Sequence, residues 1–148
     1  MLVPVFVALG VVNAVALLVV FALRWRRLDL VERYGWLYLL LVVPAVWAMV
    51  LALREGAPWQ YLVFLVIYVG FLAIEWLCDW VLRIPFRERS DWRLLVPYVG
   101  LYVSSSYGFL VMTWRESVPW GVVILALTLA QFAANAATHP RGRGRRES

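Results

Sequence analysis

The chain has 148 residues, 64% of them hydrophobic, and a formal net charge of +5 in which every basic residue is arginine. Soluble domains are typically about 45–50% apolar, so this composition excludes a water-soluble globular protein and indicates one that lies within a membrane. One cysteine and one histidine exclude an internal disulfide and a cysteine-based metal cluster, and we expect neither metal nor cofactor.

The sequence predicts an all-α membrane bundle, because it contains five apolar stretches of about 20 residues, the length that crosses a bilayer. The expected helices are 2–23, 34–53, 61–82, 94–114 and 120–138. The first has no basic segment before it and is too long for a signal-peptide core, so we interpret it as a retained helix. Residues 24–34 should form a charged, amphipathic loop on the membrane surface.

Two further features complete the expected architecture. Pro44 lies at the centre of the second helix and should kink it, because proline removes a backbone hydrogen bond. Seven of the nine tryptophans fall near predicted helix ends, as in the aromatic belts of membrane proteins. The tail 139–148, with its alternating arginine and glycine, should be disordered and basic.

The arginines are distributed on alternate connections, and this predicts the orientation. Four arginines follow each of the first, third and fifth apolar stretches, whereas the other two connections carry only Arg54 and Arg115. Because basic loops stay on the cytoplasmic side, we expect the N-terminus outside and the C-terminus inside. We therefore expect the arginines to contact anionic lipid headgroups, and we do not expect nucleic-acid binding.

The third predicted helix carries two acidic residues within the membrane. Glu75 and Asp79 are four residues apart and should share one face. Asp79 is expected near the interface, paired with Arg83, whereas Glu75 should lie about 12 Å deeper than Arg83. A carboxylate in the membrane is costly, which makes Glu75 the principal candidate for a functional group, with a structural hydrogen bond as the alternative.

The fourth helix shows two distinct patterns. Gly100, Ser104 and Gly108 recur every four residues, which is typical of a surface where another helix packs closely. Tyr102 and Ser105 occupy an adjacent face in the inner half. The fifth helix carries a polar stripe that includes Gln131 and Asn135, at the depth of Glu75 if the predicted orientation holds.

These side chains predict a candidate site in the cytoplasmic half of the membrane. Its members are Glu75, Asp79, Tyr102, Ser105, Gln131 and Asn135. The site is interpreted either as a cavity for an amphiphilic or cationic ligand, with proton-coupled transport as one use, or as a polar network that only holds the helices together.

The sequence contains no Gly-rich phosphate loop, paired-histidine motif or serine elbow, so no catalytic residue is assigned and an enzyme is not favoured. The leading hypothesis is a multi-pass protein of the cell membrane that binds such a ligand, alone or as a homo-oligomer. The alternatives are a non-catalytic subunit of a larger membrane complex and, third, an intramembrane enzyme acting on lipid.

Overall fold

The protein is a bundle of long apolar helices in a computed structural model that describes residues 1–26, 28–82 and 92–138. Five helices in the described residues are long and apolar enough to cross a membrane: Leu2–Leu23, Trp36–Arg54, Trp59–Trp76, Trp92–Glu116 and Val118–Ala136. For the described residues, the prediction of an all-helical protein with five helices long and apolar enough to span a membrane is confirmed. The predicted tail and most of the third connection lie outside the described residues.

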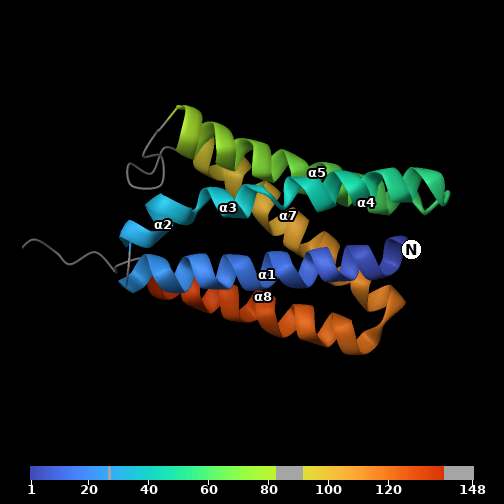
Figure 1. Cartoon of the computed structure of the whole chain (residues 1–148). Helices are drawn as coiled ribbons and strands as arrows, with labels where there is room; N and C mark the ends of the chain where they lie inside the picture. Colours follow the sequence, from blue (N-terminus) through green and yellow to red (C-terminus); the bar gives the residue numbers. More distant parts are fainter. Residues whose placement is uncertain (27, 83–91, 139–148) are drawn as a thin grey trace, which may run out of the picture.

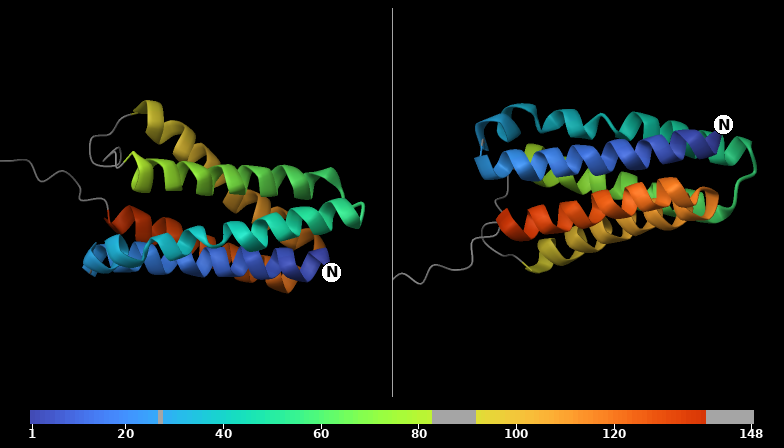
Figure 2. Two further views of the ribbon diagram at one scale, coloured as in Figure 1. Left: turned by 45° about the horizontal axis from the view of Figure 1, so that its top comes forward. Right: turned by 90° about the horizontal axis from the view of Figure 1, so that it is seen from below.

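Helix α7 (Trp92–Glu116) crosses the bundle obliquely and joins its two sides (Figure 1). On one side α1 (Leu2–Arg26) lies along α8 (Val118–Thr138), and on the other α4 (Val42–Arg54) lies along α5 (Trp59–Trp76). Helix α7 contacts α1, α5 and α8, and the two further views in Figure 2 show the same arrangement. Helices α1, α4, α5 and α8 each pack against at least two neighbours.

The two ends of the bundle differ in charge. We call the end where α1 terminates and α7 begins the arginine-rich end, since the described chain there carries Arg24, Arg26, Arg33 and Arg93. The opposite end holds the N-terminus, with Arg54 and Arg115 at the two connections. The sides of the bundle are apolar, and valines from every spanning helix are exposed on them.

The connection after α1 is helical, so the predicted surface loop is wrong. Helix α1 continues to Arg26, and a seven-residue helix, α2 (Leu28–Tyr34), follows it. Helix α2 packs back against α1, and its Leu30 and Val31 face a groove whose other wall is α1. This apolar contact gives the segment a protein surface to pack on, so it adopts a helix despite its charge.

The second spanning helix is interrupted four residues before Pro44. Its first part, α3 (Trp36–Leu39), is separated from α4 by a turn at Leu40 and Leu41. The backbone there uses the tighter three-residue spacing, with Leu41 N–H bonded to Tyr38 O at 3.2 Å and Val43 N–H to Leu40 O at 3.0 Å. Proline has no N–H for the Leu40 carbonyl and its ring crowds that group, which places the irregularity here. The predicted disturbance of this helix by Pro44 is confirmed.

The third spanning helix ends in a π-helical turn. Helix α5 runs into η1 (Leu77–Val81), where the Leu82 N–H bonds to the Leu77 carbonyl, five residues earlier, at 2.8 Å. The wider turn rotates the residues that follow relative to regular α-helical spacing. The four-residue spacing of Glu75 and Asp79 therefore no longer fixes both side chains to one face.

Tight turns and polar contacts close the opposite end of the bundle. Gly56 has φ +60° between α4 and α5, and the Ala57 N–H bonds to the Ala52 carbonyl at 3.0 Å, as in helix ends capped by a left-handed glycine. The Glu55 carboxylate accepts from the N-terminal ammonium at 2.9 Å, which holds the pKa of that carboxyl below its ordinary value. The Tyr61 hydroxyl donates to Glu116 at 2.9 Å and ties α5 to α7.

Candidate functional site

A hydrogen bond between Asn13 and Tyr38 connects α1 to α3 inside the bundle. The Tyr38 hydroxyl donates to the Asn13 Oδ1 atom at 2.7 Å, and both side chains are buried. Asn13 is the one polar side chain within the first apolar stretch. A buried amide without a partner is costly, so this bond explains how α1 accommodates an asparagine at its middle.

A second set of polar contacts lies on the other side of α1. The Gln131 amide donates to the Ala14 carbonyl at 2.8 Å, and the Tyr102 hydroxyl donates to Gln131 Oε1 at 3.1 Å. Ser105 donates to the Tyr102 carbonyl at 2.9 Å, within α7. The structure thus brings together three of the predicted site residues, Tyr102, Ser105 and Gln131. Of these, Gln131 bonds directly to the backbone of α1, and Tyr102 is linked to α1 through Gln131.

The hydroxyl of Tyr68 is buried without a standard hydrogen bond. Tyr68 lies in the middle of α5 with its side chain fully buried, and no described residue forms such a bond with its Oη atom. The Tyr38 hydroxyl is its close neighbour and interacts with it, although the geometry is not that of an ordinary hydrogen bond. A buried hydroxyl that lacks a well-formed hydrogen bond costs up to about 1–3 kcal/mol, so a polar group from a ligand or a water molecule would be a favourable complement.

Aromatic rings from three helices pack together beside these hydroxyls. Phe71, one turn beyond Tyr68 on α5, has its ring centroid 6.4 Å from Tyr38, 5.5 Å from Tyr98 and 5.9 Å from Tyr102. The rings come from α3, α5 and α7, and we call Tyr38, Tyr68, Phe71, Tyr98 and Tyr102 the aromatic cluster. The faces of such rings attract cations, most strongly where water is excluded.

Glu75 follows the aromatic cluster toward the arginine-rich end. It is four residues after Phe71 on α5, which places both residues on one side of the helix, and it is half-buried. Its carboxylate interacts electrostatically with the Tyr38 hydroxyl, across the interface between α5 and α3. Glu75 therefore lies beside the aromatic cluster.

The remaining predicted residues are Asp79, Asn135 and the three small residues of α7, which we call the small-residue stripe. The Asp79 side chain lies outside the described residues, so its pairing with Glu75 or Arg83 stays a prediction. Asn135 is half-buried, one turn beyond Gln131 on α8. The small-residue stripe divides between two surfaces: Gly108 is buried against Phe64, whereas Gly100 and Ser104 are exposed on the outside of the bundle.

Asn13 and Tyr38 were not among the predicted site residues, although they contribute a central contact. The signal for Asn13 was present in the sequence, since one amide within 22 apolar residues needs a partner in the bundle. Tyr38 gave no comparable signal. It follows Trp36 near a predicted helix end, where tyrosine is common at the membrane surface.

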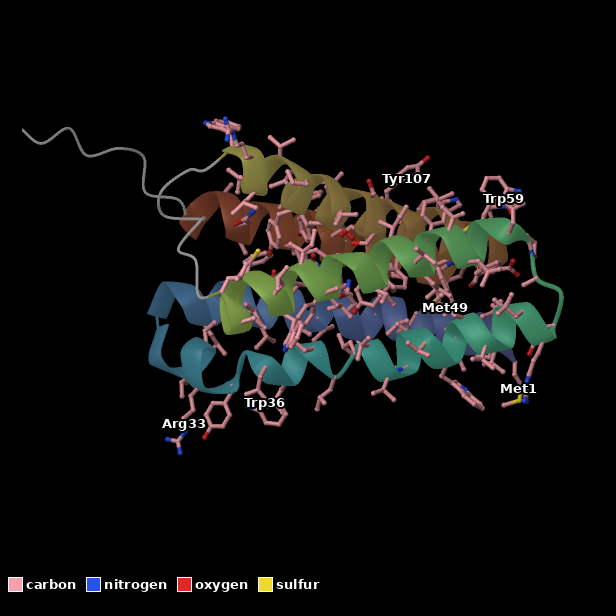
Figure 3. All side chains as sticks on the ribbon, turned by 90° about the horizontal axis from the view of Figure 1, so that it is seen from above. Met1, Arg33, Trp36, Met49, Trp59 and Tyr107 are labelled. Atoms are coloured by element: carbon pink, nitrogen blue, oxygen red, sulfur yellow. The ribbon has the colours of Figure 1, made fainter. Side chains whose placement is uncertain are left out.

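A shallow apolar groove adjoins these polar contacts at Tyr38. It has a volume of about 310 Å³ and runs between α1 and the segment formed by α2 and α3. Tyr38 belongs to both features, because its ring lines the groove while its hydroxyl reaches Asn13. Figure 3 shows the side chains over the whole bundle, with Arg33 and Trp36 projecting outward near this groove.

Comparison with known proteins gives no assignment: the chain matches no family, no curated protein and no solved structure.

Proposed function

We propose that this chain is a cell-membrane protein that binds an amphiphilic or cationic ligand within the bilayer, at a site formed by the aromatic cluster and Glu75. The ligand's charged or polar part would lie among the tyrosine rings, and its apolar part would extend toward the lipid. The same site could transport the ligand together with a proton, and Glu75 would then be the group that gains and loses that proton.

The observation that carries this proposal is the buried Tyr68 hydroxyl, which forms no hydrogen bond of ordinary geometry with any described residue. The Tyr38 hydroxyl is its close neighbour, and rings from three helices pack together beside the pair. A purely structural network would be expected to pair this group or to use phenylalanine instead. A bound polar ligand, by contrast, would use the hydroxyl directly.

Glu75 supplies the ionisable group of the proposed site. An acidic side chain within a membrane-spanning segment is unfavourable unless it contributes to binding, proton transfer or helix association. Its interaction with Tyr38 couples it to the aromatic cluster, so a change in its protonation would alter the field at the tyrosine hydroxyls. This coupling is what proton-linked binding requires.

The proposal is tested by native mass spectrometry of the protein extracted gently from its own membrane. We expect a retained small molecule or lipid of defined mass that Glu75→Gln removes. Tyr68→Phe should weaken its retention about tenfold, the effect of losing one hydrogen bond, while leaving the stability of the ligand-free protein unchanged or higher. Thermal unfolding with and without the identified molecule separates these effects.

Two matched variants serve as controls. Glu116→Gln changes a carboxylate at the opposite end of the bundle, and Tyr107→Phe removes a hydroxyl that is exposed on α7 (Figure 3). Both should retain the ligand at the level of the unmodified protein. A stable mass that contains other subunits and no small ligand would contradict the proposal and support the alternative of a subunit in a larger complex.

A further inference from the structure

The groove between α1 and the α2–α3 segment has the shape and lining of a site for a hydrocarbon chain. Nine of its twelve described lining residues are aliphatic, and the other three are Tyr34, Gly35 and Tyr38. Val12 and Val19 on one wall and Leu37 on the other are exposed, so the groove is open at the side of the bundle. None of the described residues that line it is charged.

The length of the groove corresponds to one leaflet of a bilayer. Along α1 it extends from Val12 to Leu23, which is about 16 Å at the rise of an α-helix. Half of a typical hydrocarbon core is about 15 Å thick. One end of the groove is therefore near the middle of the membrane and the other is near the surface at the arginine-rich end.

Gly35 keeps the groove open where α2 meets α3. Its backbone N–H bonds to the Val31 carbonyl at 2.8 Å, and a Cβ atom at this position would lie 2.6 Å from that carbonyl oxygen. A side chain there would displace the backbone of α2 and change the wall of the groove. The junction therefore holds its present geometry only with glycine.

Arg33 supplies positive charge next to the groove. In the sequence, the segment 24–34 that contains it has four arginines against two acidic residues, a net charge of +2. The Arg33 guanidinium lies 5.5 Å from the ring centre of Tyr34, which itself lines the groove. Arg33 is exposed and projects from the side of the bundle, at a position that a lipid headgroup can reach (Figure 3).

We propose that this groove binds one acyl chain of an anionic phospholipid from the leaflet at the arginine-rich end, with the lipid headgroup held by Arg33. The aliphatic walls provide the contact with the chain. Arg33 favours a headgroup with a net negative charge over a zwitterionic one by about fivefold. This lipid is distinct from the ligand of the aromatic cluster.

The test uses the full chain reconstituted in vesicles of equal parts phosphatidylglycerol and phosphatidylcholine with matched acyl chains. Native mass spectrometry after mild detergent release counts the lipids that remain bound. We expect one phosphatidylglycerol to be retained preferentially. Equal retention of both lipids, or retention of neither, would overturn the proposal.

Two kinds of variant assign the bound lipid to the groove. Ala16→Trp should fill the groove and reduce retention at least tenfold, whereas Ala22→Trp places the same side chain on an exposed part of α1 that does not line the groove. Val19→Trp fills the groove from an exposed position and serves if Ala16→Trp does not fold. If Ala22→Trp loses the lipid, or if both groove variants retain it, the lipid does not bind in the groove.

The headgroup contact is tested separately. Arg33→Gln should lower the preference for phosphatidylglycerol about fivefold without changing the retention of phosphatidylcholine, and Arg54→Gln, at the opposite end of the bundle, should change neither. An unchanged preference in Arg33→Gln would remove this residue from the headgroup contact and overturn that part of the proposal. Glu75→Gln should leave the lipid bound, so the failure of one proposal is distinguishable from the failure of the other.

Discussion

Asn13 illustrates how one polar residue organises its surroundings inside an apolar bundle. Its Oδ1 atom accepts from Tyr38, and the carbonyl of the next residue, Ala14, accepts from Gln131. One turn of α1 thus holds polar contacts to α3 and to α8. Because few alternative partners exist in hydrocarbon, these bonds specify how the helices are rotated against one another.

The Asn13–Tyr38 bond should make a measurable but moderate contribution to stability. Such bonds between helices in membranes average about 0.6 kcal/mol and reach about 1.7 kcal/mol in double-mutant cycles. We therefore expect a coupling energy in this range between Asn13→Ala and Tyr38→Phe, measured by reversible unfolding in mixed micelles. The single Asn13→Ala change should cost more than the coupling, because it also leaves the Tyr38 hydroxyl buried without an acceptor.

A matched cycle checks that the coupling is specific. Asn13→Ala combined with Tyr107→Phe removes a hydroxyl that is exposed on α7, so the two effects should add within about 0.3 kcal/mol. If the Asn13–Tyr38 pair is equally additive, the bond does not stabilise the bundle. The interior polar contacts would then be incidental to helix packing.

At the scale of elements, hydropathy and the positions of glycine and proline were sufficient to predict the main features of the fold. The five apolar stretches became spanning helices, and the turn at Gly56 and the irregularity before Pro44 follow from the backbone properties of those two residues. The site was harder to predict because it depends on how the helices are rotated. Tyr102 and Gln131 were identified by their depth, whereas their contact depends on the oblique path of α7.

Two features had no signal in the sequence. The π-turn at Leu77–Val81 is formed by backbone hydrogen bonds between residues five apart, such as Leu82 N–H to Leu77 O, and composition does not encode it. The groove arises because α2 folds back beside α1, in a segment whose charges predicted an open loop. Both features are consequences of tertiary packing, which cannot be predicted from the hydropathy pattern of the sequence.

The glycines of α7 allow a prediction at this scale. A Cβ atom on Gly108 would lie 2.3 Å from the Phe64 ring, whereas one on Gly100 would meet nothing within 4 Å. Gly108→Ala should therefore destabilise the bundle by about 1–3 kcal/mol through overpacking. Gly100→Ala should be neutral or stabilising by up to about 1 kcal/mol, because alanine favours the helix. Thermal unfolding in detergent measures both changes.

The same pair of variants addresses association with other chains. Since Gly100 and Ser104 are exposed together, a partner helix packed on this surface would make Gly100→Ala disruptive for assembly. We expect the oligomeric state on size exclusion to be unchanged by Gly100→Ala. A loss of higher-mass species in this variant alone would show that the exposed part of the stripe is an interface.

For the whole molecule, the arginine asymmetry predicts which end faces the cytoplasm. Twelve arginines follow the first, third and fifth spanning helices and two follow the others, and translocating basic connections is unfavourable. We expect single cysteines at positions 58 and 90, in a Cys78→Ser background, to differ in intact cells. Pro58→Cys should react with a membrane-impermeant maleimide, and Ser90→Cys should react only after the cells are permeabilised.

This orientation decides how both proposals are interpreted. With the arginine-rich end inside, Glu75 lies on the cytoplasmic side of the aromatic cluster, and the groove faces the inner leaflet, where anionic lipids carry the negative surface potential. The reverse labelling pattern would place the same groove against the outer leaflet. The arginines would then be exposed to the wrong lipids for the proposed headgroup contact, and a ligand would reach Glu75 from outside the cell. The labelling experiment therefore determines the side from which each site is supplied.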